Sequence, residues 1–279
     1  MVRFQLWKRV KIRPKEVDFM DFFDSELFGK VPSPETIEEL LILVKEHAPT
    51  RRNVYFWRGQ SDIQWPIHSA AYRRLKITNK EVTEQIMQRY EMSLLAHADH
   101  QGYRYDNTKE LKDLELLAKL QHHGAATRLI DCSRNLLIGL WFACTSEQEK
   151  NGLLFGFHSD FVGGYENELE TRFYTDVCNE LKDYDHPFVW QPPVVSKRIA
   201  SQSAQFIYSE ISNEKFGSIA ISNNVDSYIA INISPSFKKL AFKELAETFD
   251  IRHLTLFPDL DGFGYVHSFR FSQFQHNRW

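Results

Sequence analysis

The chain has 279 residues, of which 43% are hydrophobic and 25% charged, as is ordinary for a globular protein with an ample core. A net charge of −3 and a pI near 6.4 give the chain as a whole no attraction for nucleic acid or anionic membranes, although a local basic patch is compatible with them. Three cysteines are too few for a disulfide framework, no apolar run reaches membrane length, and the charged first residues do not resemble a signal peptide. The sequence therefore predicts a soluble cytoplasmic protein that does not enter membranes.

Helices dominate the predicted elements of the first half. Residues 1–15 alternate basic and apolar side chains, which indicates a strand whose basic face is either solvated or binds a phosphate or an acidic partner. Ser33, followed by Pro34 and Glu35, is typical of a helix start. A second amphipathic helix is predicted over residues 79–99.

A short strand is predicted between these helices. Residues 54–57 are aromatic or β-branched, and the run ends at Arg58, Gly59 and Gln60. A glycine allows another group to approach the backbone closely, and a guanidinium binds phosphate or carboxylate through two parallel hydrogen bonds. Arg58 is therefore either a ligand-binding residue or half of a structural ion pair.

The stretch from 115 to 157 is the most informative part of the chain. It predicts a helix that ends at a left-handed Gly124, a polar turn, an apolar helix over 136–143 with Asp131 or Ser133 as its cap, and a buried strand. The polar turn is either a hydrogen-bonded helix junction, in which Arg128 pairs with Asp131, or the floor of a ligand pocket.

Strands dominate the predicted elements of the second half. A short helix near Tyr184 and an extended loop come first. Then follow strands over 204–208, 218–222 and 227–234, a helix over 235–250, a strand over 254–257 and a turn over 258–262. Helices followed by strands predict the α+β class.

Common catalytic motifs are missing from the sequence. It contains no CxxC, HExxH, GxGxxG or GxxxxGK[ST] pattern. His122 and His123 are adjacent and would point about 100° apart on a helix, which disfavours their sharing one metal ion. Cys132 lies beside Asp131, whose charge disfavours a thiolate. The sequence therefore predicts neither a metal site nor a cysteine nucleophile.

Four segments together resemble the FRG-domain family. They are FWRGQ (56–60), LQHHGAATRLIDCS (120–133), LWFA (140–143) and RIASQSAQF (198–206). The chain departs from the family pattern where Trp57 precedes Arg58, where Cys132 replaces an aromatic residue, and where Ala204 replaces a glycine. The resemblance implies an FRG domain over residues 51–279, preceded by an extension over residues 1–50.

The order of these segments also resembles mono-ADP-ribosyltransferases of the Arg-Ser-Glu type. This likeness implies a helical N-terminal half with a mixed, mainly antiparallel β core, and NAD as a substrate without a metal. Many FRG members look like toxins or phage-defence components, which implies a protein or nucleic acid acceptor and an antitoxin-like partner. One departure concerns the catalytic glutamate of those enzymes: the equivalent region offers Gln202, and Glu210 lies one strand-length later.

The resemblance implies two sets of site residues. The catalytic set comprises Asp131, His123 and Gln202. The cofactor-binding set comprises Arg58, Gly59, Gln60, His122, Thr127, Arg128 and Ser133. The alternative function is a non-catalytic module that binds a nucleotide or another phosphorylated ligand, and a nuclease or other hydrolase is disfavoured because no set of metal ligands is evident.

Overall fold

A computed structural model describes residues 21–47, 52–106, 108–164, 168–194, 196–222 and 224–269. The predicted strand at residues 1–15 lies outside these residues. No helix in the described part of the chain combines the length and the hydropathy that crossing a bilayer requires.

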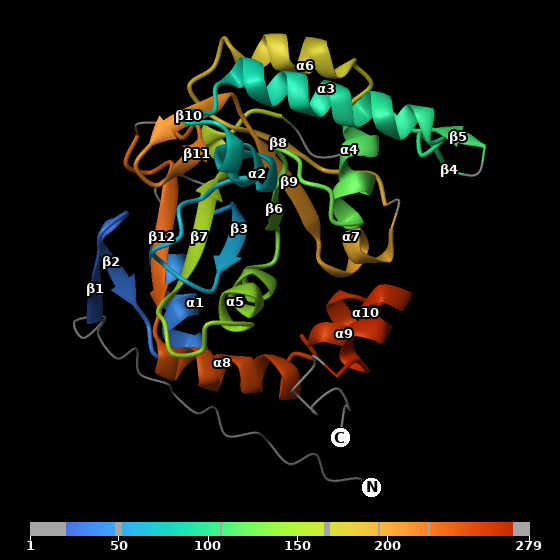
Figure 1. Ribbon diagram of the computed structural model, residues 1–279. Helices are drawn as coiled ribbons and strands as arrows, with labels where there is room; N and C mark the ends of the chain where they lie inside the picture. The colour runs from blue at the N-terminus through green and yellow to red at the C-terminus, as the bar shows by residue number, and fades with distance from the viewer. Residues whose placement is uncertain are drawn as a thin grey trace, which may run out of the picture.

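A six-stranded antiparallel sheet forms the centre of the molecule (Figure 1). Its strands, in spatial order, are β12 (Tyr228–Ile233), β7 (Gly152–His158), β3 (Tyr55–Gln60), β6 (Ile130–Ser133), β9 (Ala204–Tyr208) and β8 (Phe188–Trp190). The α+β class and the antiparallel core are confirmed. The sheet is nevertheless built from both halves of the chain, because β3 and β6, which lie near its middle, come from the first half.

Helices and small hairpins surround this sheet. The helices are α1 (Ile37–Glu46), α2 (Ala70–Thr78), α3 (Glu84–His100), α4 (Asp113–His122), α5 (Leu136–Cys144), α6 (Tyr174–Leu181), α7 (Lys197–Ser201), α8 (Pro235–Glu247), α9 (His253–Leu256) and α10 (Leu260–Val266), with a 3₁₀ turn at Ser159–Phe161. The remaining strands pair as β1 (Asp21–Ser25) with β2 (Gly29–Ser33), β4 (Tyr105–Asp106) with β5 (Lys109–Glu110), and β10 (Ile211–Glu214) with β11 (Gly217–Ile219).

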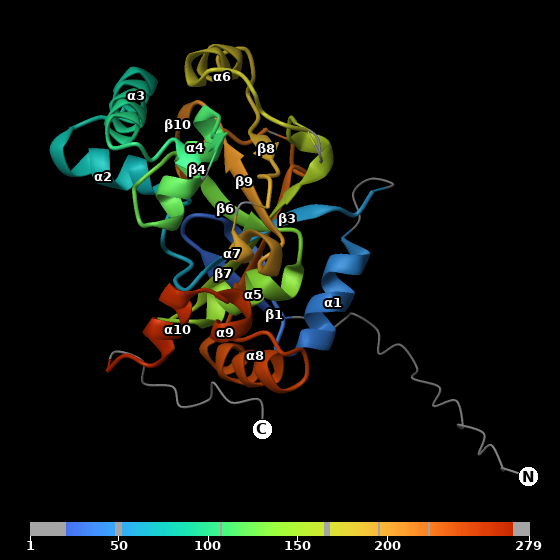
Figure 2. The same ribbon diagram turned by 90° about the vertical axis from the view of Figure 1, so that its right-hand side faces the viewer.

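Two clusters of buried apolar side chains join the helices at the two ends of the molecule to the central sheet. Figures 1 and 2 show α3 and α6 at one end, and α8, α9 and α10 at the other. One cluster of buried side chains joins α1, α5 and α8 to β3 and β12, and a second joins α3, α4 and α6 to β8 and β9. Ile37 and Leu40 of α1 therefore share a core with the strand that carries Arg58.

The sheet divides between β3 and β6. These strands pair at one position, Trp57 opposite Ser133, whereas β3 pairs with β7 along its whole length. Beyond Trp57 the two strands diverge, and the Arg58 side chain spans the gap to the main chain of β6. The divergence opens the sheet beside two of the predicted site residues, Arg58 and Asp131.

Several local predictions need correction. The cap of α1 is Thr36, because Ser33 belongs to β2, and the helix predicted over 79–99 begins later, at Glu84, with Thr83 as its cap. The cap of α5 is Asn135, because Asp131 and Ser133 pair with β9. The strand predicted over 254–257 is helix α9, and the turn that follows it begins α10.

Candidate functional site

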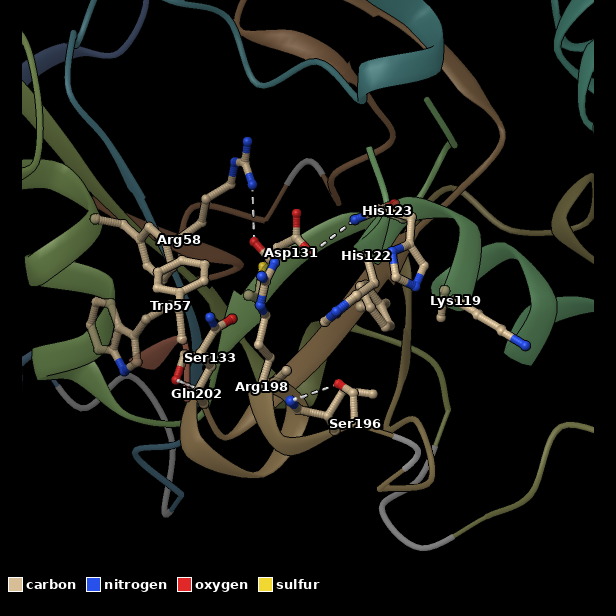
Figure 3. Close-up of a pocket in the computed structure, with 18 of the residues that line it drawn as sticks. Trp57, Arg58, Lys119, His122, His123, Asp131, Ser133, Ser196, Arg198 and Gln202 are labelled. Carbon is tan, nitrogen blue, oxygen red and sulfur yellow. Dashed lines mark hydrogen bonds between the residues drawn. The ribbon is translucent and has the colours of Figure 1, made fainter. Parts of the chain in front are cut away.

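A cleft with a volume of about 590 Å³ lies where β3 and β6 diverge (Figure 3). It is bordered by the ends of both strands, by the last turn of α4, by α7 and by the start of β9. Seven of the ten predicted site residues line it: Arg58, Gly59, His122, His123, Asp131, Ser133 and Gln202. The structure thus gathers residues from segments up to about 140 positions apart into one open site.

Arg58 is held by uncharged partners. Its Nη1 donates to the main-chain oxygen of Asp131 at 3.0 Å, and its Nε donates to Oε1 of Gln60 at 3.3 Å. The guanidinium is half-buried and lines the cleft, and among the described residues it forms no ion pair with a carboxylate. Of the two interpretations from the sequence, a structural ion pair is therefore wrong, and the charge of Arg58 is available to an anionic ligand.

The Asp131 carboxylate is positioned by a short relay that the sequence did not predict. Nε2 of Gln121 donates to Oδ1 of Asp131 at 2.8 Å, while Oε1 of Gln121 accepts a hydrogen bond from the hydroxyl of Thr127. Thr127 is fully buried, so it acts through Gln121 and does not line the cleft. The amide of Gln121 is therefore fixed in one orientation, and it fixes the carboxylate in turn.

The environment of Asp131 also changes its acidity. The side chain reaches solvent through the cleft, but the surrounding walls desolvate its charge. This desolvation raises the pKa of Asp131 above the ordinary Asp value, against the opposing effects of the Arg58 charge and the Gln121 hydrogen bond. Asp131 thus accepts a proton more readily than an aspartate with the ordinary pKa does.

Arg128 lies outside the cleft, in contrast to the predicted cofactor-binding role. Its Nε donates to Glu91 at 2.7 Å and its Nη2 donates to Glu84 at 2.8 Å, both from α3. Its side chain is 3% exposed, and Glu91 is fully buried. The suggested pairing of Arg128 with Asp131 is also wrong, since Arg128 binds glutamates of α3 whereas Asp131 binds Gln121 of α4.

The two histidines occupy the rim of the cleft. His122 is half-buried with its Nε2 3.6 Å from Oδ2 of Asp259, whereas His123 is exposed. Burial and the nearby Arg198 charge lower the pKa of His122, so this ring is neutral near pH 7. The candidate ligand atoms of His122, His123 and Asp261 lie within 4.8 Å of one another, so the two rings do converge and could hold an ion. The expectation that no metal binds stays a prediction.

Gln202 and Ser133 join the elements around the cleft. Nε2 of Gln202 donates to the main-chain oxygen of Leu256 at 3.0 Å, and its own main-chain oxygen accepts from Ser133 at 2.7 Å. The Ser133 hydroxyl also accepts from the main chain of Asn135. Both residues line the site, and both already have structural partners.

The predicted glycine and glutamine that follow Arg58 have structural partners as well. A Cβ on Gly59 would lie 2.0 Å from the main-chain oxygen of Gly139, so the group that approaches this glycine is helix α5. Gln60 is buried, with its Nε2 donating to Trp65 and its Oε1 accepting from Arg58. Gln60 therefore supports the site from behind the cleft.

Sequence reasoning missed Arg198, which lines the cleft from α7. Its Nε and Nη2 bind the Asp259 carboxylate at 2.5 and 2.8 Å, which ties α7 to the start of α10. Its guanidinium lies 4.9 Å from the centroid of the Phe257 ring. Trp57, Phe142 and Phe257 give this end of the cleft an aromatic wall. The Arg-Ile segment in which Arg198 lies was the signal available in the sequence.

Comparison with known protein families agrees with the segments that converge here. A model of the FRG domain matches residues 53–152, which include β3, the segment 120–133 with β6, α5 and the first residue of β7. The chain carries an FRG domain. This confirms the family predicted from the sequence, while the wider limits of 51–279 and the 1–50 extension stay predictions. Neither a search of curated proteins nor a search of solved structures gives a match.

Proposed function

We propose that this FRG-domain protein is an NAD-dependent mono-ADP-ribosyltransferase that acts as a toxin or phage-defence effector on a protein or nucleic acid target. The observation that carries the proposal is the convergence of Arg58, Asp131, a motif histidine and Gln202 on one open cleft. An antitoxin-like partner and cytoplasmic action belong to the same proposal. The alternative is a non-catalytic nucleotide-binding module.

Arg58 is the proposed anchor of the NAD diphosphate. Its guanidinium is kept in place by one main-chain oxygen and one amide oxygen, so the hydrogen bonds that hold it in the described part of the chain leave its charge unpaired. A charged hydrogen bond of this type contributes about 1.5–3 kcal/mol. Arg198, by contrast, already binds Asp259 and serves the architecture of the cleft.

The aromatic wall suits the nicotinamide ring. Trp57, Phe142 and Phe257 line the cleft, and offset or edge-to-face contacts between rings are favourable. Asp131 of β6 lines the same cleft, so the proposed pose places the ribose beside this carboxylate. The dimensions of the cleft fall in the range usual for small-molecule sites, about 300–1,000 Å³.

Asp131 is the proposed base. In the reaction, the bond between C1′ of the ribose and the nicotinamide nitrogen breaks, and nicotinamide leaves with the electron pair. An oxygen or nitrogen of the acceptor forms the new bond to C1′, and its proton passes to the Asp131 carboxylate. A raised pKa favours that proton transfer, and the negative charge also stabilises the oxocarbenium-like centre.

The roles of the other predicted residues follow from their contacts. Neutral His122 is a hydrogen-bonding group for the nucleotide, and exposed His123 is placed to meet the acceptor. Gln202 positions substrate through its amide oxygen, which has no hydrogen-bond partner among the described residues, and it cannot take up a proton. The chain thus replaces a late-strand glutamate with a carboxylate from β6.

The test is transfer of label from adenylate-labelled NAD to cell protein or RNA by the purified protein. We expect transfer by the wild type, loss of NAD binding in Arg58→Ala, and about 100-fold or greater loss of transfer in Asp131→Asn with binding retained. Arg172→Ala, which removes an exposed arginine outside the cleft, is the matched control and keeps full activity. NAD binding without consumption by the wild type would select the binding module, and neither binding nor consumption would refute both functions.

A further inference from the structure

One segment of this mildly acidic chain is strongly basic. Between residues 63 and 80 the sequence has no aspartate or glutamate, but it contains Arg73, Arg74, Lys76 and Lys80. The segment includes the whole of α2 and the turn that follows it. A local charge of +4 in a chain with a net charge of −3 marks this face as a separate electrostatic feature.

These four side chains are exposed, and within the described ranges none forms an ion pair with a carboxylate. Arg73 donates to the main-chain oxygen of His68, Arg74 lies over the Tyr90 ring, and Lys76 donates to the main chain of Lys80. The next basic segment behaves differently. There, Arg104 binds Asp99 and Asp113, and Lys109 binds Glu115. The charges on α2 are therefore not neutralised by the fold.

The basic face adjoins the cleft. The main-chain nitrogen of Ala71, in the first turn of α2, donates to the main-chain oxygen of Thr127 at 3.0 Å, and the Thr127 side chain begins the relay that fixes Asp131. Arg73 reaches solvent, yet the neighbouring atoms partly desolvate its guanidinium and lower its pKa; the Arg58 charge lowers this pKa further, and Asp131 opposes both effects. Arg73 is thus close enough to the site residues to respond to their charges.

An exposed aromatic residue lies on the loop that precedes the basic side chains of α2. Trp65, on the loop between β3 and α2, is 44% exposed. Its main-chain oxygen accepts from Gln60, which also accepts from Arg58, so the loop is tied to the cleft. Proteins that bind single-stranded nucleic acids combine basic side chains, which contact phosphates, with aromatic rings on which nucleobases stack. An acidic protein partner would bind the basic side chains but would leave the Trp65 indole without a stacking partner.

We propose that the α2 face, formed by Trp65, Arg73, Arg74, Lys76 and Lys80, binds single-stranded nucleic acid and delivers it to the cleft as the acceptor. Delivery as an acceptor rests on the proposed transferase function, whereas binding by the face does not. The segment binds phosphates through its cations and a base through Trp65, so recognition depends on the strand being unpaired. A duplex keeps its bases stacked inside and binds more weakly.

The test is fluorescence anisotropy with a labelled single strand of about 20 nucleotides, as RNA and as DNA, at about 50 and about 200 mM salt. We expect the triple variant Arg73→Glu, Arg74→Glu and Lys76→Glu to bind roughly 10- to 100-fold more weakly than wild type. The slope of log affinity against log salt should fall by about 2, since each lost phosphate contact contributes about 0.7. Trp65→Ala should weaken binding while leaving the salt slope unchanged.

The matched control is Lys239→Glu with Lys243→Glu, which reverses two exposed charges on α8. It should bind as wild type does, and circular dichroism should show that each variant is folded. The inference would be overturned if wild type and the α2 triple variant bound the single strand equally well. It would also be overturned if wild type bound polyglutamate as tightly as it binds the single strand. NAD turnover without acceptor is measured separately. If turnover is absent but binding depends on α2, the transferase fails and the binding face stands.

Discussion

Replacing Glu91 with glutamine should destabilise this protein far more than replacing an exposed glutamate. Glu91 is fully buried, and its two oxygens accept from the main-chain nitrogen and Nε of Arg128, at 2.6 and 2.7 Å, and from the hydroxyl of Tyr174. These contacts join α3 to α6 and to the chain that enters β6. Glu91→Gln keeps the volume of the side chain and removes its charge, so a buried guanidinium loses its main counter-ion.

The magnitude follows from the burial of both partners. Removing one member of a buried pair costs about 3–5 kcal/mol, since the other charge stays desolvated. A typical domain is stable by only about 5–15 kcal/mol, so this loss is roughly a fifth or more of a typical total. The Glu84 contact at 2.8 Å compensates in part, and the lower end of the range is therefore expected for Glu91→Gln.

The assay is urea unfolding followed by tryptophan fluorescence, with the free energy of unfolding taken from the midpoint and slope. The control is Glu180→Gln, whose partner Arg172 is 41% exposed, and for which a loss of about 0–1 kcal/mol is expected. If Glu91→Gln lost no more than the control, the structural role assigned to Arg128 would be refuted. Nucleotide binding by the folded variant should stay at the wild-type level, because Arg128 does not line the cleft.

Two further predictions concern packing and pH. Gly59→Ala should cost about 2–3 kcal/mol in unfolding free energy, because its Cβ would lie 2.0 Å from the Gly139 oxygen, and calorimetry would measure the fall in Tm. Gly264→Ala, where a Cβ meets open space, is its control, and an equal effect at both sites would contradict the packing argument. Burial lowers the pKa of His68 from 6.5 to about 4, so as the pH falls the imidazole is protonated in the unfolded chain before it is protonated in the folded one. The contribution of neutral His68 to the free energy of unfolding is therefore fully present above pH 6.5 and is lost as the pH drops toward 4. His68→Phe, which keeps the stack on Tyr72, should lose less stability than wild type between pH 7.5 and pH 5 in urea titrations, and an unchanged difference would exclude His68 as a contributor.

Part of the candidate site could be predicted from the sequence because some segments carry their chemistry locally. The strand that carries Arg58 and the helix end just before Gly124 were both predicted, and Gly124 has the expected positive φ of 89°. The relay through Gln121 was not, because Gln121 fits the helical repeat of α4 and its partners lie 6 and 10 residues away. Arg198 was missed for a similar reason, since its carboxylate partner is 61 residues distant.

The sequence by itself determined the family, the α+β class and the elements whose ends are encoded by local chemistry. Helix α8 is an example, since Ser234 caps it and Pro235 fills its first position. Only the tertiary structure decided which polar side chains between residues 122 and 133 line the cleft. Arg128 and Asp131 are three residues apart, yet one is buried against α3 and the other faces the cleft. The physical reason is that a buried charge must have a partner, and that partner, Glu91, comes from a helix 37 residues earlier in the chain.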